Sequence, residues 1–235
     1  MTVAAVILFA RIEGALADAA GRPAVRRAVE SAWAGGATPI VVVSSDVEGR
    51  VASALTGSPA VLAEPAPVNA GPVGQMARGI AVALEQVTET EAALIWPGRM
   101  AWVDAETVTT LIEAYGARRG SLLRPVYEDE PGWPVLVPVD QVAALVALGP
   151  TLMPDVLMNQ FFARSPASAT IDTGDPGVIH DIATAIDALP RFEGPPDPVG
   201  VYVHEWGVEA AEMPDDAPLE GPALAPYGQA ADEGD

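Results

Sequence analysis

The sequence predicts an α/β protein: a three-layer α/β/α domain of Rossmann-like build, with a mainly parallel sheet between two layers of helices. Two observations lead to this prediction. Apolar runs of strand length alternate with longer amphipathic stretches over residues 1–191, as expected of successive βαβ units with right-handed crossovers. The strongest of these runs are apolar at every position, which is typical of strands buried on both faces.

The expected strands are short and rich in aliphatic residues. Val3–Phe9 is a continuous apolar run at the start of the chain, and Thr38–Ser44 is β-branched and apolar at its centre. Both compositions favour buried strands over helices. The remaining expected strands are Ala60–Ala63, Glu91–Trp96, Ser121–Val126, Pro134–Val137 and Ala167–Ile171.

The expected helices carry start and stop signals. Pro23 stands in the first turn of a helix that runs to about Trp33, and Gly35 and Gly36 end it. Asp104 is placed to cap a helix that runs to about Arg118. The other expected helices are Asp46–Leu55, Val73–Val87, Val139–Leu148, Pro154–Ala163 and His180–Leu189.

The chain is strongly acidic. Its net charge is −20, from 32 acidic residues against 12 basic ones, all of them arginines. Such a surface repels nucleic acids and anionic membranes, so we expect neither as a partner. The sequence has no cysteine, which excludes disulfides, zinc–thiolate sites and thiol catalysis. It has neither a basic segment before the first apolar run nor an apolar run of about 18 residues, so we expect a cytoplasmic protein.

The composition changes at residue 192. From there to residue 235 the chain holds 11 acidic residues, no arginine and many prolines. This composition predicts a mostly disordered acidic tail, separate from the domain of residues 1–191. The tail could bind a basic protein partner. Within it, Val201–Trp206 alternates in polarity, which suits either an edge strand on its own domain or a partner-binding segment.

Several short motifs follow one another in a suggestive order. In chain order they are Leu8-Phe9-Ala10-Arg11, Gly21-Arg22-Pro23, Asn69 with the segment Gly74–Ile80, the segment Leu94–Asp104, the segment Gly132–Val137, and the segment Asp181–Asp187. Over residues 3–190 this order resembles the MobA-like nucleotidyltransferases, which include the molybdenum cofactor guanylyl- and cytidylyltransferases. The resemblance implies a nucleotidyltransferase fold, which is glycosyltransferase-A-like.

The resemblance also implies which residues would contact a nucleotide or a pterin. In the family, the loop after the first strand offers glycines, an arginine and a lysine to the phosphates. Here the loop Arg11–Ala20 has one glycine, no lysine and two acids. Arg11 and Arg22 can each face an anion or form a surface ion pair. The ligand-binding candidates are Leu8, Ala10, Arg11, Arg22, Asn69, Gly74, Gly98 and Trp133.

Three tryptophans belong to the same part of the expected domain. Trp96, Trp102 and Trp133 stand near strand ends, at the presumed mouth of the site. They can stack on a base or a pterin, or they can pack in the core or at its rim.

The family's metal site is altered in this sequence. Magnesium binds carboxylates and phosphate oxygens. The resemblance aligns one metal-binding aspartate of the family with Arg99 and the second carboxylate with Ala183. Arg99 can bind a phosphate or join a salt bridge. Asp104 and Asp181 can cap helices or bind a metal. We expect no metal site, and the catalytic candidates are Arg99, Asp104 and Asp181.

These departures lead to two hypotheses. The first is a non-catalytic accessory or binding protein of this fold, acting in molybdenum cofactor or molybdoenzyme maturation. The second is an active nucleotidyltransferase with a remodelled site, moving a nucleotide to a phosphorylated acceptor such as molybdopterin. The cofactor is unknown, because only the second hypothesis implies Mg²⁺ and a nucleoside triphosphate. A glycosyltransferase ranks last, because the sequence has no Asp-x-Asp motif.

Overall fold

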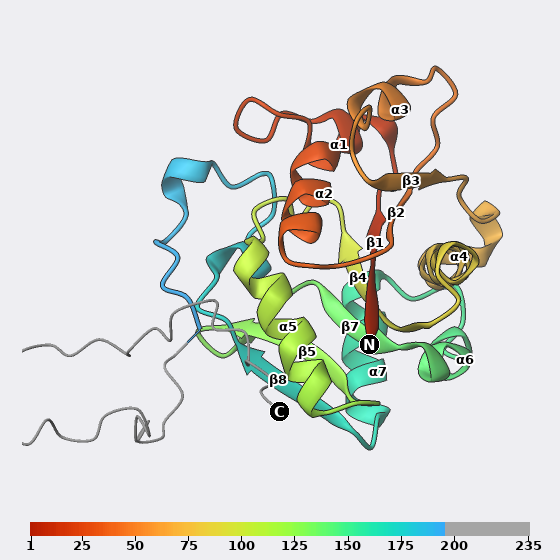
Figure 1. Cartoon of the computed structure of the whole chain (residues 1–235), viewed down its shortest axis with the longest axis vertical. Helices are drawn as coiled ribbons and strands as arrows, with labels where there is room; N and C mark the ends of the chain where they lie inside the picture. Colours follow the sequence, from red (N-terminus) through yellow and green to blue (C-terminus); the bar gives the residue numbers. More distant parts are fainter. Residues whose placement is uncertain (196–235) are drawn as a thin grey trace, which may run out of the picture. The chain divides into compact units, whose positions relative to one another are not determined.

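A mixed sheet of eight strands forms the middle layer of the domain (Figure 1). The computed structural model describes residues 1–195. The strand order is β3-β2-β1-β4-β7-β5-β6, and β8 pairs with β5. The predicted three-layer α/β/α fold is confirmed. The predicted acidic tail lies outside the described residues except for its first four, and the segment Val201–Trp206 lies wholly outside them.

The first half of the sheet is parallel. It contains β1 (Thr2–Leu8), β2 (Ile40–Val43), β3 (Ala60–Ala63) and β4 (Thr90–Pro97). β1 pairs with β2 on one side and with β4 on the other. The chain adds β2 and β3 on one side of β1 and then returns to add β4 on the other side. The carboxyl ends of β1 and β4 therefore form a topological switch point.

The second half of the sheet brings in antiparallel pairs. β7 (Val135–Pro138) runs antiparallel to β4 and to β5 (Leu122–Tyr127). The short strand β6 (Glu130–Pro131) closes a hairpin with β5. β8 (Ser168–Asp172) pairs with β5 in parallel. This hairpin and β8 lie at the far edge of the sheet.

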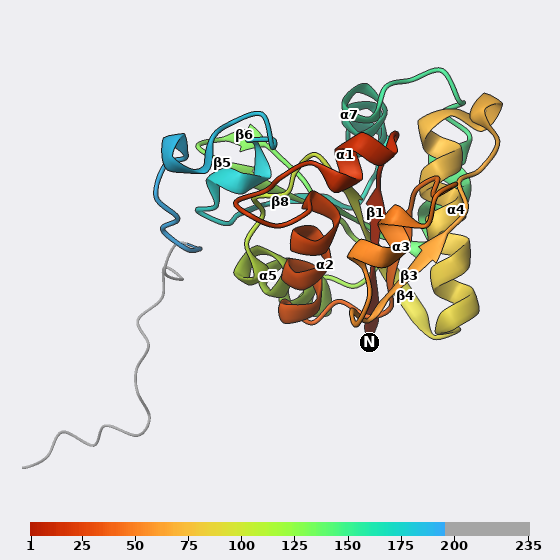
Figure 2. The ribbon, with the colours of Figure 1, turned by 90° about the horizontal axis from the view of Figure 1, so that it is seen from above.

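Helices cover both faces (Figure 2). α2 (Ala24–Ala34) and α5 (Ala105–Ala117) pack together on one side of the sheet. α4 (Gly71–Gln86) lies on the other side, in contact with α6 (Val142–Val146) and α7 (Pro154–Arg164). The remaining helices are the short α1 (Ile12–Leu16) and α3 (Arg50–Ala54) and the 3₁₀ turns η1 (Val68–Ala70), η2 (Val139–Gln141), η3 (Pro176–Val178) and η4 (Ile186–Ala188). No helix of the described residues is long and apolar enough to span a membrane.

Small residues let the layers approach closely. The centre of β1, Ala4–Ile7, is completely buried, as its unbroken apolar run predicts. Gly79 of α4 faces this strand, and a Cβ atom there would lie 2.2 Å from the Cγ1 atom of Val6. The glycine therefore sets how near α4 can lie to the sheet.

Buried Asp175 ties the segment after β8 to α5. Its carboxylate accepts hydrogen bonds from the backbone N–H of Asp104 at 2.9 Å, from the Thr107 hydroxyl at 2.7 Å and from the backbone N–H of Gly177 at 2.7 Å. The side chain is 2% exposed. Burial raises the pKa of Asp175 above its ordinary value, although the three hydrogen bonds oppose the shift.

Two predicted elements are wrong. The segment His180–Leu189 is not an α-helix but a series of turns that ends in η4. Trp102 explains this, because its indole N–H donates to the backbone oxygens of Asp181 and Thr184, while the Asp181 carboxylate accepts from the N–H of Ala183. These contacts favour a turn. The predicted loop Arg11–Ala20 contains α1, which buries Ala15.

Candidate functional site at the carboxyl ends of β1 and β4

The switch point between β1 and β4 is closely packed. The N–H of Gly98 donates to the backbone oxygen of Leu8 at 2.8 Å, which holds the two strand ends together. The Phe9 ring lies over Gly98, where a Cβ atom would come within 2.2 Å of it. Phe9 is buried and α1 begins three residues later. An aromatic ring and a short helix thus follow β1 where the family resemblance implies a glycine-rich phosphate loop.

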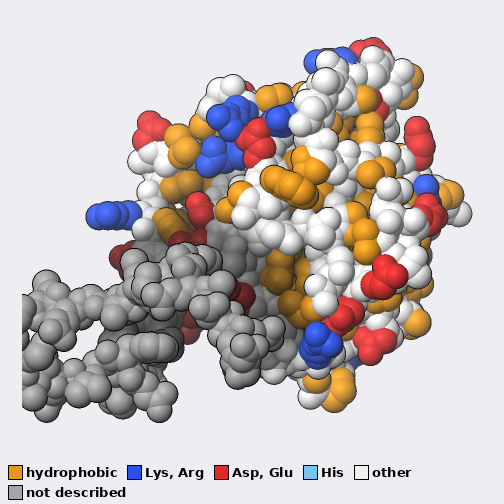
Figure 3. All heavy atoms as spheres, viewed as in Figure 1, with side chains coloured by type: hydrophobic (Ala, Val, Ile, Leu, Met, Phe, Trp, Pro, Cys, Tyr) orange, Lys and Arg blue, Asp and Glu red, His pale blue; other side chains and the backbone are white. Residues whose placement is uncertain are grey.

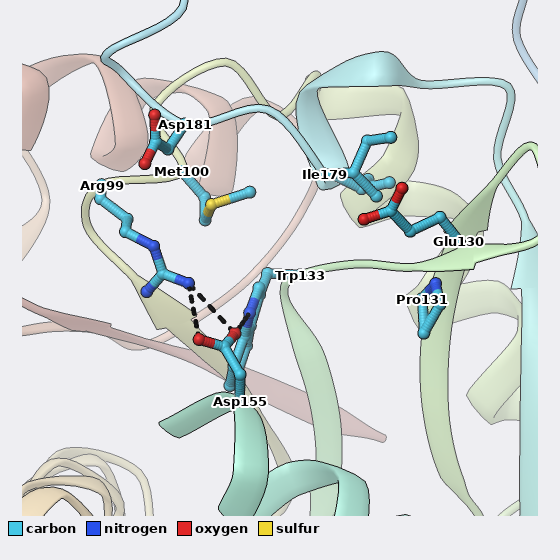
Figure 4. Close-up of a pocket in the computed structure, with 9 residues that line it drawn as sticks. Arg99, Met100, Glu130, Pro131, Trp133, Asp155, Ile179 and Asp181 are labelled. Atoms are coloured by element: carbon cyan, nitrogen blue, oxygen red, sulfur yellow. Dashed lines mark hydrogen bonds and ion pairs between the residues drawn. The ribbon is translucent and has the colours of Figure 1, made fainter. Parts of the chain in front are cut away.

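A pocket of about 160 Å³ opens beside this point (Figure 4). It lies between the end of β4, the residues that lead into β7, the start of α7 and the segment before Asp181. Its charged and aromatic lining residues are Arg99, Glu130, Trp133, Asp155 and Asp181. Three predicted site residues, Arg99, Asp181 and Trp133, therefore meet in one pocket.

Asp155 links the pocket's arginine to its tryptophan. One terminal nitrogen of Arg99 lies 3.1 Å from each carboxylate oxygen of Asp155. The indole N–H of Trp133 donates to the same carboxylate at 2.8 Å (Figure 4). The Arg99 and Asp155 side chains are 39% and 53% exposed, so water screens their attraction. Of the two roles predicted for Arg99, the structure shows the salt bridge.

The pocket holds more negative than positive charge. Three acidic residues, Glu130, Asp155 and Asp181, line it together with one arginine, Arg99. One carboxylate oxygen of Asp181 also accepts a hydrogen bond from the N–H of Ala183, at 2.9 Å. Among residues 1–195 no three carboxylate or imidazole groups are close enough together to hold a metal ion. The arrangement therefore suits a cationic or neutral ligand better than a polyphosphate.

The other predicted site residues lie elsewhere. Asp104 caps α5 by accepting from the N–H of Glu106 at 2.9 Å, which is the structural role predicted for it. Arg22 forms an ion pair with Glu30 on the surface. Arginine and acidic side chains lie close together on the face that Figure 3 presents. Ala10, Arg11 and Asn69 are exposed, and Gly74 lies in the first turn of α4, so none of these residues lines the pocket.

The three tryptophans separate in the structure. Trp96 is completely buried and donates to the backbone oxygen of Met100. Trp102 is buried beneath the guanidinium of Arg27, 5.0 Å from its ring centroid. Only Trp133 lines the pocket. Trp96 and Trp102 therefore pack in the core and do not line the pocket.

Sequence reasoning missed two features. Asp155 stands 56 residues from Arg99, and nothing in its own segment marks it as a partner. The second feature is the carboxylate of Asp172, which is the last residue of the last strand, β8, and stands in the run Ile171-Asp172-Thr173. Asp172 is exposed and accepts from the N–H of Gly174, away from the pocket.

Known structures share this architecture. A nucleotidyl transferase from Methanothermobacter is 15% identical, with a TM-score of 0.62 over 77% of this chain and 91% of the other. The 4-diphosphocytidyl-2C-methyl-D-erythritol synthase from Anaerococcus prevotii is 14% identical, with a TM-score of 0.61 over 80% and 94%. A manganese complex of the Mycobacterium tuberculosis protein Rv0371C is 16% identical, with a TM-score of 0.55 over 77% and 94%. At these identities the likeness establishes the fold.

The sequence itself identifies the family. No curated protein sequence matches this chain. The family profile of the MobA-like NTP transferase domain matches residues 13–166, from α1 through α7 to just before β8. That match covers well over half of the chain and all of the parallel half of the sheet except β1. The chain belongs to the MobA-like NTP transferase family.

Proposed function

We propose that this protein uses the nucleotidyltransferase fold as an accessory or binding protein and does not carry out magnesium-dependent nucleotidyl transfer. The proposal includes a role in molybdenum cofactor or molybdoenzyme maturation, because the family resemblance points to enzymes of that cofactor. One observation carries the non-catalytic part. At the end of β4, where the resemblance implies a metal-binding aspartate, Arg99 forms a salt bridge with Asp155.

Magnesium does not fit the residues at this strand end. The cation needs carboxylate or phosphate oxygens in a near-octahedral shell. The two Asp155 oxygens that could serve are already 3.1 Å from the guanidinium of Arg99. A divalent cation bound there would lie against a positive charge, and Asp181 already uses one oxygen on the backbone.

The size and charge of the pocket support the same proposal. Its volume of about 160 Å³ is below the roughly 300–1,000 Å³ of pockets that enclose whole ligands. Phe9 covers Gly98, so the backbone at this strand end is closed to the near approach that phosphates require. A small or partial ligand, such as the edge of a pterin or a protein side chain, fits the pocket better than a nucleoside triphosphate.

An active transferase with a remodelled site is the second candidate. It is favoured by Asp155 and Asp181, which line the same pocket as Arg99, because one or two carboxylates can hold a magnesium ion when substrate phosphates supply the other oxygens, and Arg99 could then pair with a phosphate. In that case the arginine would be essential. Arg99→Ala would then abolish turnover, whereas under the first proposal there is no turnover to lose.

Pyrophosphate release separates the two candidates. The full chain would be incubated with molybdopterin and CTP, GTP or ATP, with Mg²⁺ or with Mn²⁺, the ion in the mycobacterial complex. We expect no release above the blank. Metal-dependent release that disappears in Arg99→Ala and persists in Arg119→Ala, an exposed arginine paired with Glu91, would overturn the proposal in favour of the enzyme.

A further inference from the structure

A second pocket, of about 270 Å³, lies between α7 and the outer edge of the sheet. Val126 of β5 and Thr170 of β8 form its sheet side, and Phe162 and Ala163 of α7 form its helix side. These walls are mostly apolar. Arg124 of β5 is the one cationic residue among those that line it. None of the predicted site residues belongs to this pocket.

Arg124 is a buried cation with only neutral hydrogen-bond acceptors. The residue is 5% exposed. Its Nε–H donates to the backbone oxygen of Gly132 at 3.0 Å, and its two terminal nitrogens donate to the Asn159 side-chain oxygen and to the backbone oxygen of Pro131. No carboxylate within residues 1–195 forms an ion pair with it.

This arrangement leaves both charge and donors unmatched. A guanidinium has five N–H donors, and the contacts within residues 1–195 use three of them. Burial lowers the pKa of Arg124, and the nearby Asp155 carboxylate only partly opposes this shift. Arginine nevertheless stays protonated, so the cost of burying its charge persists until an anion pairs with it.

The surroundings select the kind of anion. Asp129 lines the same pocket, and Glu128 and Glu130 flank it on the exposed hairpin. These acids repel phosphates and other multiply charged ligands. One carboxylate balances one guanidinium and matches its fork geometry. The apolar walls favour a hydrocarbon body on the same molecule.

We propose that this pocket binds a small monocarboxylate with an apolar body, whose carboxylate pairs with Arg124 and whose hydrocarbon part packs between Phe162, Ala163 and Val126. The site adjoins the pocket of Arg99, and Pro131 is the one lining residue that the two pockets share. Trp133 stands between the two, with the Arg124 guanidinium 5.9 Å from its ring centroid and its indole N–H on Asp155. The proposal therefore stands or falls independently of nucleotide binding.

Calorimetric titration of the full chain with 4-methylpentanoate tests the proposal, with the isosteric amide 4-methylpentanamide as the uncharged probe. We expect the carboxylate to bind about tenfold or more tightly than the amide, because the uncharged amide cannot form the charge-assisted pair with Arg124 in the desolvated site. Inorganic phosphate at equal concentration should not compete. Equal binding of acid and amide, equal competition by phosphate, or no binding of the acid would each overturn the proposal.

Variants locate the site. Arg124→Met keeps an unbranched apolar stem and removes the charge, and it should weaken carboxylate binding about tenfold or more. Ala163→Leu, at an exposed helix position, should fill the pocket and weaken binding with Arg124 intact. Arg118→Met removes an exposed arginine elsewhere and should change nothing. If Arg124→Met does not fold, Ala163→Leu decides alone, and wild-type affinity in that variant would overturn the proposal.

Discussion

Replacing Asp175 by alanine should destabilise the domain more than any change at the exposed acids around it. The carboxylate accepts from the buried N–H of Gly177, from the part-buried N–H of Asp104 and from the Thr107 hydroxyl. An unmet buried donor costs about 1–3 kcal/mol, and the hydroxyl can rotate to another acceptor. Removing a buried charge returns part of this cost, so we expect a net loss of about 3 kcal/mol.

Thermal unfolding followed by circular dichroism measures this loss. For a domain of this size, a loss of about 3 kcal/mol corresponds to a fall in Tm of roughly 6–12 °C. Asp172→Ala is the matched control, because Asp172 is exposed and accepts one hydrogen bond, from Gly174. We expect that control to stay within about 0.5 kcal/mol of wild type. A Tm for Asp175→Ala within 2 °C of that of Asp172→Ala, on the order of the scatter expected at such sites, would refute the account of Asp175 as the tie between β8 and α5.

Three further predictions follow from particular contacts. Because burial raises the pKa of Asp175 above 3.8, the stability that the protonated side chain adds is fully present below that pH and is lost as the pH rises through the native pKa. The difference in free energy of unfolding between wild type and Asp175→Asn, measured in urea, should therefore narrow from pH 3.5 upward. A difference that widens with pH would contradict this sign. Gly79→Ala should cost about 1–3 kcal/mol in the same assay, because its Cβ meets Val6, whereas Gly116→Ala on α5 has only ordinary contacts and should stabilise by about 0.5–1 kcal/mol; equal effects would show that close packing is not the cause. A double-mutant cycle on Arg99 and Asp155 should give a coupling of about 0.2–1 kcal/mol that falls with salt, as half-exposed pairs do, and a coupling above about 3 kcal/mol would indicate a desolvated pair.

The regular elements could be predicted because each carries its own signal. The unbroken apolar runs of β1 and β2 and the proline and glycine boundaries of α2 depend on neighbouring residues alone. Asp104 caps α5 where the sequence places it. The antiparallel insertion of β7 between β4 and β5 could not be predicted, because the pairing of strands depends on contacts that periodicity does not encode.

The segment after β8 shows why some sequence predictions fail. The stretch from His180 to Leu189 has helical composition, but the indole N–H of Trp102 takes two of its backbone oxygens. Tertiary contacts of this kind override local propensity. The same limit applies to the site. Arg99 could be predicted as a site residue from the sequence, whereas its partner Asp155 comes from a helix that is distant in the sequence.

Under the proposed function, the end of β4 does not bind a metal-bound nucleotide. A thermal-shift titration of the full chain with CTP, GTP and ATP, each with and without Mg²⁺, tests it most directly. A ligand present at about 100 times its Kd stabilises the native state by roughly 2.7 kcal/mol, which such a scan detects. We predict no magnesium-dependent rise in Tm with any of the three. A magnesium-dependent rise with one nucleotide, lost in Arg99→Ala, would contradict the claim and identify the base that the site prefers.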